Sequence, residues 1–412
     1  MAGIETTVEA GDVGLDESRL ERITSHFDRY VADGRLAGYL ATVARGGEVA
    51  YVGMGGYRDR EADKPMTADT IFRIYSMTKP ITTVAAMRLW EEGRFELTDE
   101  IAPIIGAFKD PRVFVGGSLN DPITAPSQEP IRIWHLMTHT AGMTYGFQYT
   151  HTVDGLYRKA GYEWGSPAGV DLAGACETWA SLPLLFEPGT SWNYSIATDV
   201  LGRVIECVTG ERLDVALRRL VLDPLGMDET SFFAPEDVHD RVAQLYIPDG
   251  SNGMRAFPVP DMGKAALRDP FAHSGGGGLV STAHDYKRFT GMLLAGGELD
   301  GVRILSPRTL DYMTRNHLPG DVDLEVLAED TFSETAYAGV GFGLGFAVVL
   351  DSRPSRVPTT EGSYSWGGAA STAFWVDPAE GLEVAFYTQL LPSGTHPIRS
   401  QLSQLVYSSI ID

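Results

Sequence analysis

The sequence predicts an α+β fold in which one antiparallel sheet is built from both ends of the chain and flanked by the terminal helices. Three observations predict this fold. Strand patterns lie near both ends of the chain, amphipathic helical patterns lie at both termini, and the long middle carries short helical patterns with many prolines. The simplest assembly joins residues 1–90 and 291–412 into one α/β region, and residues 91–290 then form a second, mostly helical region.

The first element is a helix predicted over residues 16–33. Leu20, Ile23 and Phe27 recur at helical spacing, so they share one apolar face. Asp16 stands at the start of this pattern, where its side chain can cap the helix N-terminus. The other elements predicted, in chain order, are strands over 39–44 and 48–52 joined by a glycine turn, a helix over 76–90, strands over 343–350, 370–376 and 382–390, and a helix over 398–411.

Composition excludes several classes of protein. The chain is 43% hydrophobic and carries a net charge of −22 with no cluster of Lys and Arg, which argues against binding to nucleic acid or to an anionic membrane surface. No apolar stretch is long enough to cross a bilayer, and the N-terminus shows no secretory signal, so a cytoplasmic location is expected. Cys176 and Cys207 lie among apolar residues and are interpreted as buried thiols. The sequence leaves the oligomeric state open.

Ser76 is the leading candidate for a nucleophile. It begins the segment Ser76-Met77-Thr78-Lys79, and no other lysine of the chain has a serine three residues before it. Positions i and i+3 of a helix share a face, so the Lys79 amine can reach back toward the Ser76 hydroxyl. A serine hydroxyl becomes a good nucleophile only when a neighbour takes its proton. The segment is therefore a candidate catalytic pair that needs no histidine.

Two segments far along the chain accompany this pair. One runs from Pro188 to Ser195 and contains Tyr194, and the other contains Trp366-Gly367-Gly368-Ala369. In this order the segments resemble the serine hydrolases of the class C β-lactamase and penicillin-binding-protein fold (β-lactamase/transpeptidase-like), and most closely the family VIII carboxylesterases within it. Four further segments share the resemblance: Trp134 to Gly142, Glu187-Pro188-Gly189, Asp223 to Met227, and Gly277 to Ala283.

The resemblance implies a role for each matched residue. Ser76 attacks the substrate carbonyl and becomes acylated, and Lys79 helps to deprotonate it. Tyr194 acts as general base on Ser76 or on the deacylating water, and later protonates the leaving group. The backbone N–H groups of Ser76 and Ala369 form the oxyanion hole, in a cleft between the two regions. Two assignments stay open, because Lys79 is either a cation that lowers the pKa of Tyr194 or itself the neutral base.

Two departures from the family pattern bear on the substrate. β-Lactamases and peptidases of this fold usually carry Lys-Thr-Gly where this chain has Trp366-Gly367-Gly368, so an apolar ring replaces a positive charge. Ile196 stands where the family usually has an asparagine that binds the acyl-side carbonyl. Both changes make the cleft more apolar and remove anchors for a β-lactam. The expected activity is hydrolysis of small, short-chain acyl esters, with no cofactor and no metal.

Other residues are assigned to the cleft by their neighbourhood. Gly367 and Gly368 are interpreted as letting the backbone approach the acyl group closely, although they also fit a strand with a glycine bulge. Tyr145 and Phe147 are plausible aromatic residues of the cleft lining, and they fit a core position equally well.

Several alternatives compete with the assignment as a carboxylesterase. An acyltransferase, a β-lactamase or a D-amino-acid peptidase would use the same acyl-enzyme, and a non-catalytic binding protein would keep only the fold. His135 and His139 have a spacing that suggests zinc, but no third ligand is apparent. The run Gly275 to Gly278 lacks the Gly-Lys-Ser/Thr of a phosphate loop and is interpreted as a turn against the active-site helix. No G-x-S-x-G elbow occurs, which argues against a Ser–His–Asp triad.

Overall fold

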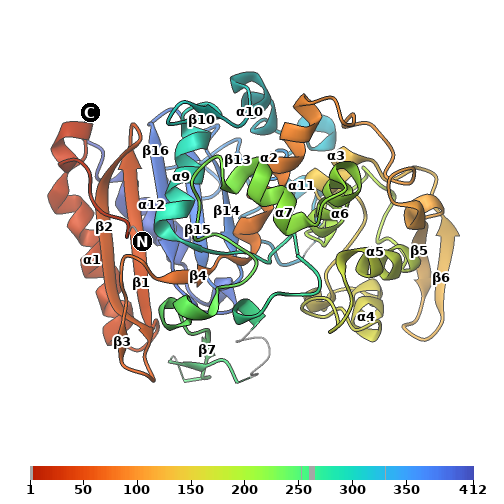
Figure 1. The fold of residues 1–412 in the computed structure, drawn as a ribbon, viewed down its shortest axis with the longest axis horizontal. Coiled ribbons are helices and arrows are strands. Elements are labelled where there is room, and N and C mark those ends of the chain that lie inside the picture. The colour runs from red at the N-terminus through yellow and green to blue at the C-terminus, as the bar shows by residue number, and fades with distance from the viewer. Residues whose placement is uncertain (1–2, 252, 259–264, 330) are drawn as a thin grey trace.

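One antiparallel sheet, with strands from both ends of the chain, organises the fold (Figure 1). The computed structural model describes residues 3–251, 253–258, 265–329 and 331–412, so residues 1–2, 252, 259–264 and 330 of the predicted regions lie outside the description. Within the described residues the sheet has eight strands, and all its neighbouring strands run antiparallel. Their spatial order is β12 (Val340–Phe342), β13 (Ala347–Val349), β14 (Tyr364–Gly368), β15 (Thr372–Asp377), β16 (Leu382–Tyr387), β1 (Gly38–Arg45), β2 (Glu48–Asp59) and β3 (Lys64–Pro65).

Helices and shorter strand pairs surround this sheet. The helices are α1 (Glu17–Ala32), α2 (Thr78–Glu91), α3 (Ile133–Met137), α4 (Thr152–Lys159), α5 (Leu172–Ser181), α6 (Ala197–Thr209), α7 (Leu213–Leu217), α9 (Ala283–Leu294), α10 (Pro307–Met313), α11 (Leu324–Leu327) and α12 (Ile398–Tyr407). The strand pairs are β4 (Ile71–Arg73) with β9 (Val280–Thr282), β5 (Arg112–Gly117) with β6 (Pro122–Pro126), β7 (Tyr246–Pro248) with β8 (Met254–Ala256), and β10 (Glu298–Leu299) with β11 (Val302–Arg303). The α+β class expected from the sequence is confirmed.

The two faces of the sheet are covered by different helices. Successive side chains of a strand point to opposite faces, so β1 contributes to two cores. Tyr39 and Val43 lie in the core beneath α1 and α12, whereas Leu40 lies in the core that contains residues of α2 and α9. The N-terminal helix begins as predicted, because the Asp16 carboxylate accepts a hydrogen bond from the backbone N–H of Arg19 at 3.1 Å.

Helix α2 runs between the sheet and the helical region (Figure 1). It contacts α6 and α7, and its residues from Thr78 through Met87 are all buried. A helix that is enclosed on every side has no solvent-facing polar side, which explains why its sequence shows little amphipathic contrast. The polar side chains that it buries are hydrogen-bonded, as Thr82 is to the Gly275 carbonyl at 2.8 Å. The start of this helix is therefore held by tertiary packing as well as by its own hydrogen bonds.

The C-terminal strands differ from the prediction in their boundaries. The strand expected over 343–350 is a hairpin of β12 and β13, because the backbone N–H of Gly343 bonds the Phe346 carbonyl at 2.7 Å and turns the chain. The segment Tyr364 to Gly368 forms β14, a strand that the sequence indicated only as an alternative, because its glycines weaken the alternating pattern. The final helix ends at Tyr407, four residues before its predicted end at 411.

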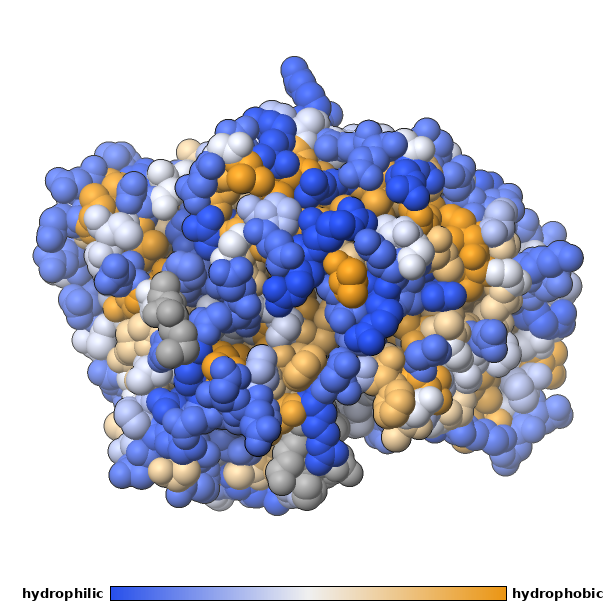
Figure 2. Space-filling view, in the orientation of Figure 1, coloured by the Kyte–Doolittle hydropathy of each residue, from blue (hydrophilic) through white to orange (hydrophobic). Residues whose placement is uncertain are grey.

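The surface is mainly hydrophilic on the face drawn in Figure 2, in keeping with the net charge of −22. Within the described part of the chain, no helix combines the length and the apolar character that a membrane crossing requires. Cys176 is buried as expected, but the reading of Cys207 as a buried thiol is wrong, because its side chain lies on the exposed side of α6.

Candidate active site

Ser76 lies where a short strand turns into a buried helix. β4 ends at Arg73, and Ser76 belongs to the single turn of 3-10 helix, Tyr75–Met77, that precedes α2. The residue before it, Tyr75, has a φ of +43°, a conformation that is rare for a bulky side chain and marks a backbone held by its surroundings. The hydroxyl of Thr78 accepts a hydrogen bond from the Leu279 N–H at 3.1 Å, which ties the start of α2 to the segment before β9.

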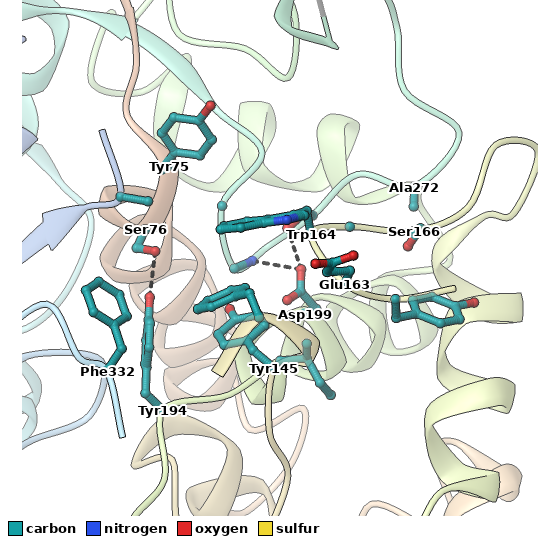
Figure 3. A pocket seen from close by; sticks show the side chains of 18 of the residues that line it. Tyr75, Ser76, Tyr145, Glu163, Trp164, Ser166, Tyr194, Asp199, Ala272 and Phe332 are labelled. Atoms are coloured by element: carbon teal, nitrogen blue, oxygen red, sulfur yellow. Dashed lines mark hydrogen bonds between the residues drawn. The ribbon is translucent and has the colours of Figure 1, made fainter. Parts of the chain in front are cut away.

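The three residues predicted to carry the chemistry meet at one point. The Tyr194 hydroxyl donates to Ser76 Oγ at 2.5 Å, and Lys79 Nζ lies 3.4 Å from the same oxygen (Figure 3 shows the tyrosine bond). Lys79 Nζ also donates to the Tyr145 hydroxyl at 2.9 Å and to the Gly276 carbonyl at 2.6 Å. It lies 4.5 Å from the centre of the Tyr194 ring. The geometry required for proton transfer to and from Ser76 is thus present.

Burial sets the protonation states of this cluster. Desolvation lowers the pKa of Lys79 to about 7, although the nearby negative charges of Asp199 and Glu334 oppose this shift. Burial also raises the pKa of Tyr194 well above its usual value of 10.0, and the charge of Glu334 adds to the rise. The neutral phenol is therefore favoured for Tyr194, and a substantial fraction of Lys79 is a neutral amine near pH 7.

Ser76 opens onto a cavity of about 390 Å³ (Figure 3). Of the residues that the sequence assigned to the site or its cleft, the cavity lining includes Ser76, Tyr145, Phe147, Tyr194, Ile196 and Ala369. Trp366, Gly367 and Gly368 are not among the described lining residues. The structure therefore brings together the catalytic candidates and the aromatic candidates, but it places most of β14 behind the cavity.

Trp366 packs against Tyr194 and does not line the cleft. The sequence had suggested a cleft position, because Trp366 stands where the family pattern usually has a lysine. Its side chain is only 2% exposed, and its ring packs edge-on against Tyr194 with 5.4 Å between centroids. A second edge-on contact, at 5.3 Å, joins it to Phe342 of β12. Such aromatic contacts stabilise a fixed ring orientation, so Trp366 holds the phenol in place from outside the cavity lining.

The two glycines of β14 each leave room for a neighbouring protein group. A Cβ atom at Gly367 would clash with the guanidinium of Arg399, which reaches beneath the strand from α12. A Cβ atom at Gly368 would clash with the carbonyl of Ile74, two residues before Ser76. Gly367 thus permits a close approach of Arg399 to β14, and Gly368 permits one of the chain just before Ser76, whereas the approach of these glycines to an acyl group stays a prediction.

Two carboxylates of the site were not found from the sequence. Asp199, on the first turn of α6, accepts hydrogen bonds from the Ser274 hydroxyl at 2.5 Å and the Gly276 N–H at 3.1 Å. It thereby fixes the segment whose Gly276 carbonyl receives Lys79. Its position five residues after Tyr194 was the available signal, but an acidic residue in the first helical turn is also typical of a capping role. Glu334 stands in an irregular segment and offered no signal.

The two histidines that suggested zinc have separate partners. His135 Nδ1 accepts the backbone N–H of Arg132 at 3.0 Å, and His139 Nδ1 lies 3.2 Å from the Ser195 hydroxyl. Burial lowers the pKa of His135 to about 4 and that of His139 well below its usual value. Over the described ranges, no cluster of three or more His, Cys, Asp or Glu side chains could hold a metal ion.

Comparison with known proteins identifies the family. The chain matches the Beta-lactamase family over residues 23–407. Esterase EstB of Burkholderia gladioli is 32% identical over 426 residues, covering 99% of each chain, and Protein Rv1367c of Mycobacterium tuberculosis is 36% identical over 373 residues, covering 88% of each. The solved structure of EstCE1, a hydrolase with promiscuous acyltransferase activity, superimposes with a TM-score of 0.79 at 29% identity and covers 95% of this chain and 98% of its own. With its sheet, its motifs and these relatives, the chain belongs to the Beta-lactamase family of serine hydrolases, as the resemblance implied.

Proposed function

We propose that this protein is a serine carboxylesterase that hydrolyses short-chain acyl esters through an acyl-Ser76 intermediate. One observation carries the proposal: Ser76 Oγ lies 2.5 Å from the Tyr194 hydroxyl and 3.4 Å from Lys79 Nζ on the wall of a cavity. EstB is named an esterase and EstCE1 a hydrolase, which supports the ester class. The lining also draws on both predicted regions, Ala369 on one side and Phe147 on the other, which supports a site in the cleft between them.

In the proposed acylation step, the neutral amine of Lys79 takes the Ser76 proton while Ser76 Oγ forms a bond to the ester carbonyl carbon. The carbonyl electron pair moves onto its oxygen, and the backbone N–H groups of Ser76 and Ala369 stabilise this oxyanion. When the intermediate collapses, the bond to the alcohol oxygen breaks, and Tyr194 donates its proton to that oxygen. The Lys79 ammonium returns a proton to Tyr194. Water then attacks the acyl-enzyme in the same way and releases the acid.

The lowered pKa of Lys79 and the raised pKa of Tyr194 support the choice of Lys79 as the base in acylation. Of the two assignments that the sequence left open, a tyrosinate beside a lysine cation would require the opposite order of pKa values. Tyr194 then acts as the proton donor to the leaving group, a role that its hydrogen bond to Ser76 Oγ makes geometrically direct.

A second candidate function is acyl transfer to an alcohol. It is favoured by EstCE1, whose description as a hydrolase with promiscuous acyltransferase activity names both reactions. The acyl-enzyme would be the same, and an alcohol would replace water in the second half-reaction. A β-lactamase or D-amino-acid peptidase is disfavoured by Trp366 and Ile196, because neither offers a charged or amide anchor to a β-lactam. The cytoplasmic location stays a prediction.

The test of this function compares two substrates on the purified protein. We expect p-nitrophenyl butyrate to be hydrolysed with a kcat/KM at least about tenfold above that for nitrocefin, since the lost anchors each contribute about that much to binding. A higher value for nitrocefin would contradict the ester assignment and favour a β-lactamase. Product analysis with added butanol would separate hydrolysis from transfer, because transfer yields butyl butyrate.

The pH dependence of kcat/KM should report the protonation state of the Lys79 amine. Burial penalises its charged form, so Lys79 is protonated and unable to accept a proton below its pKa of about 7, and neutral above it. We therefore expect kcat/KM to rise with pH and to reach half of its plateau near pH 7. Released acid, titrated in a pH-stat with ethyl butyrate, gives the profile without a pH-sensitive chromophore. A profile that falls through this range would instead require the lysine cation in the active form.

A further inference from the structure

The cavity at Ser76 is lined by acidic side chains without a basic one. Glu163, Asp199 and Glu334 belong to its lining, and no Lys, Arg or His is among the described lining residues. Figure 3 shows Glu163 and Asp199 among the side chains that surround the cavity. The whole chain carries a net charge of −22, so the long-range field has the same sign as these groups.

The cations near the cavity are already engaged by protein groups. Lys79 Nζ donates to Ser76, Tyr145 and the Gly276 carbonyl. Arg399 bonds the carboxylate and the carbonyl of Glu334, and it reaches the Thr372 carbonyl at 3.3 Å. Neither cation can turn toward a substrate carboxylate without breaking these bonds. An anionic group in the cavity would therefore meet carboxylates without a compensating donor.

Two of these carboxylates keep an oxygen without a partner. Asp199 is 5% exposed, and its Oδ1 accepts both of its hydrogen bonds, whereas its Oδ2 accepts none from the described residues. Glu334 is 3% exposed, and its Oε1 likewise has no hydrogen-bond partner in the described part of the chain. A buried carboxylate oxygen is stabilised by a donor or a positive charge. Arg399 already supplies a positive charge to Glu334, so Oδ2 of Asp199 is the position that favours a ligand with a donor or a positive charge.

An aromatic stack lines the same cavity. The rings of Tyr145 and Phe147 are stacked with centroids 4.6 Å apart, and Phe147 stacks on Trp164 at 5.0 Å. Trp164 is 51% exposed and follows Glu163 in the chain, which places this end of the stack at the cavity entrance. The faces of aromatic rings attract cations, most strongly when the cation is partly desolvated.

We propose that the preferred ester of this site carries a positively charged ammonium group, which lies against the Tyr145–Phe147–Trp164 stack with the carboxylate of Asp199 nearby. This inference rests on the proposed function, because it places the ester carbonyl at Ser76. It assigns Asp199, Glu163 and Trp164 a part in substrate selection. The expected order of preference is cationic, then neutral, then anionic esters of the same shape.

Three thioesters of one shape test the order. Butyrylthiocholine carries a quaternary ammonium, S-(3,3-dimethylbutyl) thiobutyrate replaces its nitrogen by carbon, and S-(3-carboxy-3-methylbutyl) thiobutyrate replaces one methyl group of that isostere by a carboxylate. We expect kcat/KM for the cation to exceed that for the carbon isostere by about tenfold or more, and the anion to be the poorest substrate. Released thiol reports all three reactions in the same way.

Variants locate the cause of the preference. Asp199→Asn and Glu163→Gln should each reduce the ratio of cationic to neutral kcat/KM, whereas Glu177→Gln should leave the ratio unchanged. Glu177 provides a matched control because it removes the same charge from the exposed side of α5, outside the cavity lining. The ratio within one variant cancels any change in the chemical step, which matters because Asp199 also acts on the pKa of Lys79.

A binding measurement separates this inference from the proposed function. Choline should bind Ser76→Ala protein in calorimetry more tightly than 3,3-dimethylbutanol, and Asp199→Asn should remove the difference. Equal binding of the two alcohols, or a neutral thioester that equals the cationic one, would overturn the ammonium proposal and leave the esterase intact. Choline binding without turnover of any ester would instead overturn the proposed function.

Discussion

Replacing Ser76 by alanine should abolish ester hydrolysis. The substitution removes the oxygen to which Tyr194 donates and that lies 3.4 Å from Lys79 Nζ, so no acyl-enzyme can form. Loss of a nucleophile that works within a catalytic group lowers kcat by about 10⁴-fold or more in comparable serine enzymes. The measurement is the initial rate with p-nitrophenyl butyrate, together with labelling by a fluorophosphonate probe that should modify Ser76 and no other serine.

The control for this variant is a serine outside the site. Ser181→Ala changes an exposed side chain at the end of α5, where the hydroxyl bonds only the Thr178 carbonyl, and it should retain wild-type activity. Both variants should unfold near the wild-type temperature, because Ser76→Ala deletes one hydroxyl and no packed carbon atoms. Retained turnover in Ser76→Ala protein, or probe attachment at another serine, would refute the nucleophile assignment.

Replacing Tyr194 by phenylalanine should lower kcat by about 10²-fold to 10⁴-fold, the range typical of a lost general acid or base. The ring is kept, so its edge-on contacts with Trp366 at 5.4 Å and Tyr145 at 5.3 Å survive. Only the hydroxyl that donates to Ser76 Oγ disappears. The leaving alkoxide then departs without its proton donor, which slows the collapse of each tetrahedral intermediate.

Tyr30→Phe is the matched control for this second variant. Tyr30 is also buried, and its hydroxyl donates from α1 to the Gln401 side chain of α12 at 2.8 Å, in the core on the far side of the sheet. The Tyr30→Phe variant loses an equivalent hydrogen bond away from the site, so the activity of this variant should stay near that of the wild type. Mass spectrometry of each variant during turnover adds a readout, because impaired deacylation leaves a butyryl group on the protein. Wild-type kinetics in Tyr194→Phe protein would exclude a proton-transfer role.

The two neighbours of Ser76, Lys79 and Tyr194, were predicted from the sequence in different ways. Ser76 and Lys79 are three residues apart at the start of one helix, so local geometry alone brings them together. Tyr194 is 118 residues from Ser76 and was assigned only through the resemblance, because no periodicity links the two segments. The family pattern thus carried the information that chain geometry could not supply.

The surroundings of Trp366 and Gly367 were not predicted from the sequence, for one physical reason. Trp366 and Gly367 were interpreted from the chemistry of their side chains, but their positions depend on the strand β14 and on what packs behind it. The Trp366 ring turns toward Phe342, and Gly367 faces Arg399 from the distant helix α12. Alternation along a strand determines that neighbours face opposite ways, yet only the assembled sheet decides which way is the cavity.

By itself the sequence determined the α+β class, the terminal helices, the position of the Ser76–Lys79 pair at a helix start, and the family. These features depend on local periodicity and on motifs that neighbouring residues define. Only the tertiary structure decided that Lys79 is buried with a pKa near 7, that Trp366 supports Tyr194 from behind, and that Asp199 and Glu334 line the cavity. Burial and long-range electrostatics depend on which distant segments meet, and that is a property of the folded chain as a whole.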